Sequence, residues 1–161
     1  VIDLSESVPQ IRIPGFESAP DAAFVRGVAG GTLPQVITRL NVLHMLSAQG
    51  VRIYNDVKAI ERTVDKAMTS FLLRMHGVAT PPTWTCESRA QAESIRQMAA
   101  DCHQQLVIKP LFGSQGQGVR KLPIEEPLPI PMLQYVDGVY YLQQLIETAD
   151  AAHDYRVFVV G

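Results

Sequence analysis

An apolar run that ends in a lysine and passes directly into a glycine-rich loop constrains this chain most strongly. Residues 106–108 are three aliphatic side chains, which predict a buried strand, and Lys109 stands at its end. Gly113, Gly116 and Gly118 follow at short intervals. Glycine adopts positive φ and lets backbone N–H groups approach an anion closely. The stretch therefore predicts a nucleotide-phosphate site, although an ordinary glycine-rich β-turn explains the glycines alone equally well.

The order of the lysine and the glycines excludes two familiar phosphate loops. A P-loop has its lysine after the glycines and beside Ser or Thr, whereas Lys109 precedes them. The spacing also differs from the G-x-G-x-x-G of a dinucleotide-binding loop, and residues 119–122 continue as a strand rather than a helix. The segment therefore predicts two strands joined by a flexible glycine-rich lid.

The composition places the chain among globular proteins and narrows its partners. Its 161 residues are 47% hydrophobic and 19% charged, which provides enough apolar material for a core. A net charge of -2 without a basic block argues against nucleic acid as a partner. No apolar run approaches the roughly 20 residues of a membrane span, and residues 1–6 lack the pattern of a secretory signal. We therefore expect a cytoplasmic protein with no membrane partner.

The thiol and imidazole side chains form no metal-binding pattern. Cys86 and Cys102 are too far apart for a C-x-x-C motif, so we expect two free thiols. The four histidines are dispersed along the chain, which favours surface or helix-end positions over a zinc site.

The first third of the chain predicts an incomplete βαβ unit. Residues 22–28 indicate a buried strand, residues 34–49 carry apolar side chains at helical spacing, and residues 51–54 indicate a second strand. The strand and helix that usually precede such a unit are missing, so we expect residues 1–58 to form a partial α/β domain. Arg26 follows the first strand, where it can meet an anion at the sheet edge or pair with a nearby acid.

The remainder of the chain, residues 59–161, predicts an α+β unit with an antiparallel sheet. An apolar stripe at helical spacing runs from residue 60 to Gly77, with Asp65 in its first turns. A second helical pattern covers residues 89–103. Strands are expected at residues 106–109, 119–122, 139–146 and 155–160, with a Pro-rich connector at residues 123–131.

Four motifs in a fixed order resemble a known enzyme family. Asp65-Lys66 opens a helix, residues 107–109 lead into the glycine loop, residues 142–146 read Leu-Gln-Gln-Leu-Ile, and Asp154-Tyr155-Arg156 precedes an apolar strand. Together they resemble the ATP-grasp ligases, most of all the glutamate-adding carboxylate-amine ligases of the RimK type. The resemblance covers the N-terminal and central part of such an enzyme. It implies ATP held between two α+β subdomains, an acyl-phosphate intermediate, and its capture by an amine to form an amide.

The resemblance also assigns roles to individual residues. Lys66 and Lys109 would meet the α- and β-phosphates, because two ammonium groups can balance charge that one cannot. The backbone of Leu145 and Ile146 would meet the adenine edge, and Arg156 would act in catalysis on the phosphate or the acyl phosphate. The implied ATP-binding residues are Lys66, Lys109, Gly113, Ser114, Gln115, Gly116, Gly118, Gln143, Gln144, Leu145, Ile146 and Asp154, with Ser114 and Gln115 on the outer phosphates, Gln143 and Gln144 beside the adenine, and Asp154 on the ribose. Relatives often place an acid where this chain has Gln144. Arg26 is the candidate for contact with a substrate other than ATP.

The resemblance places the metal site outside this chain. Members of the family hold Mg²⁺ or Mn²⁺ with an Asp, a Glu and an Asn that follow the strand at which this sequence ends, so ligands are expected beyond Gly161 and none within it. On this ground we expect a fragment of a ligase domain, cut before its metal-binding half, that is inactive by itself.

The implied partners are ATP or ADP, a carboxylate donor and an amine acceptor, with glutamate added to a protein or cofactor. Self-association into a homo-oligomer is a further possibility. One alternative is a non-catalytic nucleotide-binding or assembly module of the same fold, and a metal-independent kinase is another.

Overall fold

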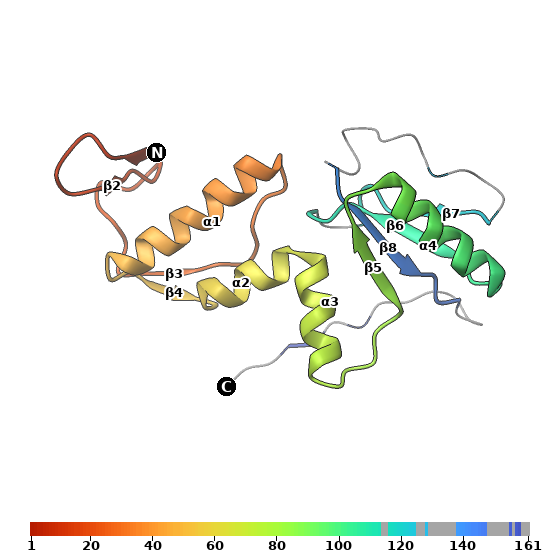
Figure 1. The fold of residues 1–161 in the computed structure, drawn as a ribbon. Coiled ribbons are helices and arrows are strands. Elements are labelled where there is room, and N and C mark those ends of the chain that lie inside the picture. The colour runs from red at the N-terminus through yellow and green to blue at the C-terminus, as the bar shows by residue number, and fades with distance from the viewer. Residues whose placement is uncertain (114–115, 125–127, 129–137, 148–154, 156, 159–161) are drawn as a thin grey trace.

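The fold was analysed in a computed structural model of the chain. It describes residues 1–113, 116–124, 128, 138–147, 155 and 157–158. Figure 1 shows two regions, an N-terminal one around helix α1 and a C-terminal one around a sheet, with helix α3 between them.

The N-terminal region contains the predicted βαβ unit. Strand β3 (Ala22–Phe24) pairs in parallel with β4 (Arg52–Tyr54), and α1 (Leu33–Ala48) connects them. The side chain of Gln35 accepts from the N–H of Thr32 at 2.9 Å, which fixes the start of α1. Val36, Leu40 and Leu46 form the buried stripe that the helical spacing predicted. A short antiparallel hairpin precedes this unit, with β1 (Ile2–Asp3) and β2 (Gln10–Ile11).

The expectation that residues 22–28 form a buried strand is wrong in two respects. The strand ends at Phe24, and the side chain of Phe24 is 68% exposed. It stacks on Tyr54 of the neighbouring strand with ring centroids 5.4 Å apart. Helix α1 lies along one side of this sheet (Figure 1). Among the described residues the sheet has only two strands, so no further strand shields Phe24.

Two helices stand where a single helix was expected from residue 60 to Gly77. Helix α2 (Val57–Val64) and helix α3 (Lys66–Met75) are separated by Asp65, which has an extended backbone. The carboxylate of Asp65 accepts from the N–H groups of Ala67 at 2.8 Å and Met68 at 3.1 Å. Asp65 is therefore the N-cap of a new helix, a role for which aspartate is among the preferred residues.

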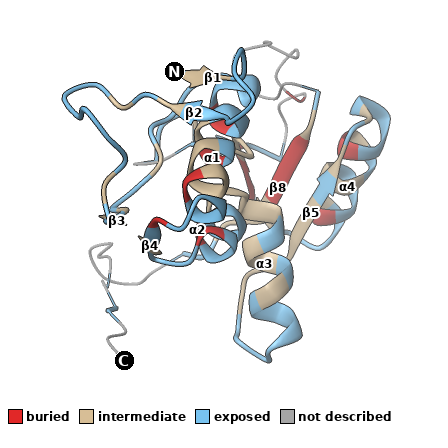
Figure 2. Ribbon diagram, turned by 90° about the vertical axis from the view of Figure 1, so that its left-hand side faces the viewer, coloured by how far each residue is buried: buried red, intermediate tan, exposed pale blue. Residues whose placement is uncertain are grey.

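The C-terminal region is an antiparallel sheet, as predicted. It contains β5 (Thr83–Cys86), β6 (Leu106–Lys109), β7 (Arg120–Leu122) and β8 (Tyr140–Gln144), in the order β5-β8-β6-β7. Helix α4 (Arg89–Asp101) covers one face and contributes Ala92 and Ala99 to a core with Leu106, Ile108 and Leu142. In Figure 2 the buried residues of β8 mark this core. The α+β fold class expected from the sequence is thus confirmed.

Strand pairing determines which side chains lie on the face opposite α4. Gln143 is paired with Val107 on one side and Thr83 on the other, and Lys109 is paired with Tyr141. Because side chains alternate along a strand, Lys109, Tyr141, Gln143 and Thr83 share this second face. Helix α3 lies against part of it, where the Ser70 and Tyr141 hydroxyl groups are 2.7 Å apart.

Two strands expected near the end of the chain differ from the structure. The strand expected at residues 139–146 ends at Gln144, so Leu145 and Ile146 follow it. Of the strand expected at residues 155–160, the described Tyr155, Val157 and Phe158 lie in no strand, and each is more than 80% exposed. The proposed domain boundary at residue 58 falls inside α2 and stays a prediction.

Candidate nucleotide site

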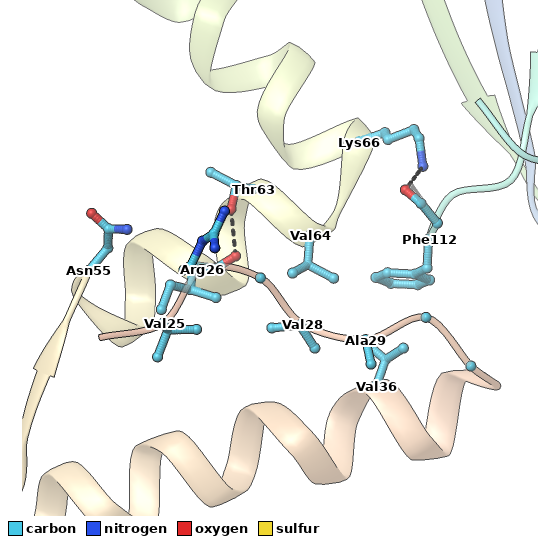
Figure 3. Close-up of a pocket in the computed structure, with 15 residues that line it drawn as sticks. Val25, Arg26, Val28, Ala29, Val36, Asn55, Thr63, Val64, Lys66 and Phe112 are labelled. Carbon is cyan, nitrogen blue, oxygen red and sulfur yellow. Dashed lines mark hydrogen bonds between the residues drawn. The ribbon is translucent and has the colours of Figure 1, made fainter. Parts of the chain in front are cut away.

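Helix α3 begins at the glycine-rich loop, and its first residue is Lys66. The backbone N–H of Lys66 donates to the carbonyl of Leu111 at 3.4 Å. Its ammonium group donates to the carbonyl of Gly113 at 3.0 Å (Figure 3). It also donates to the carbonyl of Leu111 at 3.3 Å. The helix start thus holds this lysine directly beside the loop that follows β6.

Lys109 approaches the same place from the sheet. It is the last residue of β6, and its ammonium group donates to Oε1 of Gln143 on β8 at 2.5 Å. Among the described residues, no carboxylate forms an ion pair with either Lys66 or Lys109. Within the described part of the chain, the hydrogen-bond acceptors of both ammonium groups are neutral oxygen atoms.

The two lysines lie close enough to repel each other. Burial lowers the pKa of Lys66, and the charge of Lys109 lowers it further, while Asp65 opposes the shift. Burial also lowers the pKa of Lys109. Two half-buried ammonium groups with depressed pKa values favour an anion between them, because the anion relieves both desolvation and repulsion.

The loop between β6 and β7 has the backbone conformation that the glycines predicted. Gly113, Gly116 and Gly118 have φ values of 142°, 69° and 74°, which L side chains rarely adopt. A Cβ added at Gly113 would lie 4.0 Å from Nζ of Lys66. The positive φ values and the nearby ammonium group fit a loop that passes close to phosphate. Ser114 and Gln115, also expected here, lie outside the described residues.

The residues after β8 offer fewer backbone groups to an adenine than expected. The N–H of Leu145 donates to the carbonyl of Gln105 at 2.8 Å, so it is occupied within the fold. The N–H of Gln144 donates to the carbonyl of Pro82 at 2.9 Å. Ile146 is 57% exposed. The carbonyl of Leu145 and the N–H of Ile146 therefore remain as the candidate adenine contacts.

Arg26 lies in a cavity next to the lysine site. The cavity measures about 350 Å³ and lies between the β3–α1 loop, α2 and the glycine-rich loop. Figure 3 shows Arg26 and Asn55 toward one end of it, and Lys66 and Phe112 toward the other. Within the described residues no acid forms an ion pair with Arg26, so the salt bridge considered from the sequence is not found there.

The structure does not test every residue of the expected site. Asp154 and Arg156 lie outside the described residues, so their roles stay predictions. Of the residues expected to bind ATP, it brings together Lys66, Lys109, Gly113 and Gln143.

The described residues do not fit a metal ion. In the described part of the chain no three His, Cys, Asp or Glu side chains come together in a group able to bind one.

One contact of the site could not have been found by motif. Nε2 of Gln143 donates to the Thr83 hydroxyl at 2.9 Å and approaches the Tyr141 hydroxyl at 3.4 Å. Thr83 is 60 residues away in sequence, and only the pairing of β5 with β8 brings it to Gln143.

Comparison with known proteins finds ligases that are similar in sequence. No protein-family model matches the chain. Over 86% of its length it is 31% identical to the tetrahydromethanopterin:alpha-L-glutamate ligase of Methanococcus maripaludis, covering 47% of that protein. Over 70% of its length it is 28% identical to the alpha-aminoadipate-LysW ligase LysX of Saccharolobus solfataricus, covering 41% of it.

A solved structure shares the fold. The ATP-grasp ligase PsnB in complex with a minimal precursor matches 80% of this chain and 44% of its own, with a TM-score of 0.51 and 18% identity. The chain shares the fold of this ATP-grasp ligase. It spans less than half of the length of either curated relative. The resemblance inferred from the sequence motifs is confirmed. Among the described helices, none is long and apolar enough to cross a membrane.

Proposed function

We propose that this ATP-grasp homologue is part of an ATP-dependent ligase that joins a carboxylate to an amine. The main support is a pair of ammonium groups, those of Lys66 and Lys109, which lie near each other beside the glycine-rich loop. Among the described residues, neither forms an ion pair with an acid. Relatives named as glutamate ligases support glutamate as the amine substrate. We also propose that the chain divides into two domains, residues 1–58 and 59–161.

The proposed reaction has two steps, formation of an acyl phosphate and formation of the amide. A carboxylate oxygen of the first substrate attacks the γ-phosphorus of ATP, which forms an acyl phosphate and releases ADP. The amino group of glutamate then attacks the acyl carbon, and inorganic phosphate and a proton leave as the amide forms. Lys66 and Lys109 stabilise the phosphate charge in the first step.

We assign the cavity around Arg26 to the carboxylate substrate. A guanidinium can bind a carboxylate through two parallel hydrogen bonds, and Arg26 lines the same cavity as Lys66 and Gly113. A carboxylate held there lies next to the predicted phosphate position. Arg156 is proposed to stabilise the acyl phosphate, and Asp154 to bind the ribose.

The test of this function is ligation with defined probes. The full-length parent protein that contains this chain is incubated with ATP, labelled L-glutamate and either tetrahydromethanopterin or a peptide ending in glutamate, and ADP and labelled amide are measured. Equal amounts of ADP and amide support the ligase. Arg26→Ala is expected to raise the KM for the carboxylate probe, at a cost of about 1.5–3 kcal/mol for a hydrogen bond to a charged group.

The same assay distinguishes the alternative of a non-catalytic nucleotide-binding module. ATP binding without product from either probe supports that module. If this 161-residue chain alone forms amide, the expectation that it is inactive by itself is wrong.

A further inference from the structure

The hydroxyl group of Thr83 has a fixed direction. It donates its only proton to the carbonyl of Pro81 at 2.9 Å. A hydroxyl that has given its proton away can only accept from a second partner. The contact between Thr83 and Gln143 must therefore run from the amide NH₂ of Gln143 to the hydroxyl oxygen of Thr83, at 2.9 Å.

This direction determines which atom of Gln143 faces Lys109. Amide oxygen and nitrogen have nearly the same shape, so their assignment depends on the hydrogen-bond network. Because Thr83 binds the nitrogen, the oxygen points to the ammonium group of Lys109 at 2.5 Å. If the amide were reversed, its NH₂ would face a cation that has only donors. Thr83 thus holds Gln143 in the orientation that accepts from Lys109.

A second contact is compatible with this orientation. Nε2 of Gln143 lies 3.4 Å from the hydroxyl of Tyr141, which can accept from it. Tyr141 is 3% exposed and bonds to Ser70 on α3 at 2.7 Å. We call the chain of contacts from Thr83 through Gln143 to Lys109 and Tyr141 the relay. It connects β5 to β8 and reaches α3, the helix that carries Lys66.

The relay also determines what Lys109 can offer a ligand. An ammonium group has three N–H donors, and one of them is used by Gln143. Two donors therefore remain beyond the bond to Gln143, and they are the ones proposed to meet the phosphates.

We propose that Thr83 is a positioning residue for the nucleotide site, which orients Lys109 through the amide of Gln143. The inference rests on the proposed function for its consequence in ATP binding. Its structural part concerns the ligand-free protein and can be tested without nucleotide.

The first test is ATP binding by calorimetry. Thr83→Val keeps the branched shape but loses the hydroxyl, so the amide can reverse and release Lys109. We expect the Kd for ATP to rise about tenfold, equivalent to about 1.4 kcal/mol. Thr83→Ser restores the hydroxyl and is expected to bind within about twofold of the wild type. Thr85→Val is the matched control, because it makes the same change two residues along the same strand, where the threonine is not among the described hydrogen-bond partners of the Gln143 amide.

The second test observes Lys109 directly. Nuclear magnetic resonance of lysine side chains labelled at Cε gives the pKa of Lys109 in the ligand-free protein. Lys66 faces Lys109 from α3, so each variant is compared with the wild type, in which that charge is the same. Losing an oriented acceptor lowers the pKa of Lys109 further in Thr83→Val but not in Thr85→Val. A purely structural role for Thr83 would leave this pKa unchanged.

The outcomes separate this inference from the proposed function. An unchanged pKa of Lys109 in a folded Thr83→Val protein overturns the relay, whatever happens to ATP. If that pKa falls but Lys109→Ala binds ATP as the wild type does, the relay stands and the nucleotide site fails. If Lys109→Ala loses ATP and Thr83→Val does not, the positioning role is rejected and the site remains.

Discussion

At the scale of single residues, the site is defined by two lysines whose ammonium groups are partly buried, which lowers the pKa of both. Lys66 bonds to loop carbonyls and Lys109 to an amide oxygen, and neither has a carboxylate partner among the described residues. From the sequence, Lys109 was selected by its place between an apolar run and the glycine loop, whereas Lys66 was selected only through the family resemblance. The sequence could not show their partners, because Gln143 and Leu111 reach the lysines only through tertiary contacts.

The depressed pKa of Lys66 predicts a change of stability with pH. The unfolded chain binds more protons than the folded one between the lowered pKa and the ordinary value of 10.5. The free energy of unfolding therefore contains an unfavourable contribution at neutral pH, which disappears as pH rises through that window. Lys66→Met removes the titrating group. Urea unfolding should show the wild type gaining stability relative to this variant between pH 7 and pH 10.5.

Lys58→Met is the control for this prediction, because Lys58 is an exposed lysine on α2. Its stability difference from the wild type should be similar at both pH values. The explanation is contradicted if the difference for Lys66→Met is equally flat.

At the scale of elements, the sequence predicted those whose pattern is local. Helices α1 and α4 and strand β6 appeared where periodicity and apolar runs placed them. The single helix expected from residue 60 was wrong because the apolar stripe continues across Asp65, while the carboxylate of that residue starts a new helix. Strand β3 was expected to be buried because its residues are apolar, but burial depends on neighbouring strands that a local pattern does not report.

The cap at Asp65 gives a prediction at this scale. Asp65→Ala removes the acceptor for the N–H groups of Ala67 and Met68, and we expect a loss of about 1 kcal/mol in the free energy of unfolding. Because α3 begins with Lys66, ATP binding should also weaken. Asp65→Asn retains an accepting oxygen and should lose less of both. Equal stability of Asp65→Ala and wild type in denaturant unfolding would show that the cap does not hold this helix.

At the scale of the whole molecule, two apolar clusters lie on either side of the site. One contains Val36, Leu40 and Ile60, and the other surrounds Leu142 between α4 and the sheet. Phe112, from the glycine-rich loop, packs against the first cluster although β6 belongs to the second. The lysine site therefore lies where the two regions meet.

Truncating one core side chain in each region should lower stability in both cases but should weaken ATP binding mainly in one. Leu142→Ala empties a fully buried position in β8, the strand that carries Gln143, and should cost about 2–5 kcal/mol together with much of the ATP affinity. Leu40→Ala should cost a similar amount but affect mainly the N-terminal region, leaving ATP affinity nearer the wild type. Denaturant unfolding and ATP titration of both variants make the comparison. Equal losses of ATP affinity would contradict the division.

The most direct test of the central claim is calorimetric titration of ATP into the wild type, Lys66→Ala, Lys109→Ala and the exposed control Lys58→Ala. The account predicts that wild type and Lys58→Ala bind alike, and that each site variant loses at least about tenfold in affinity, since each removes a half-buried charge from the phosphates. Binding that is unchanged in both Lys66→Ala and Lys109→Ala would contradict the assignment of these lysines to the nucleotide site.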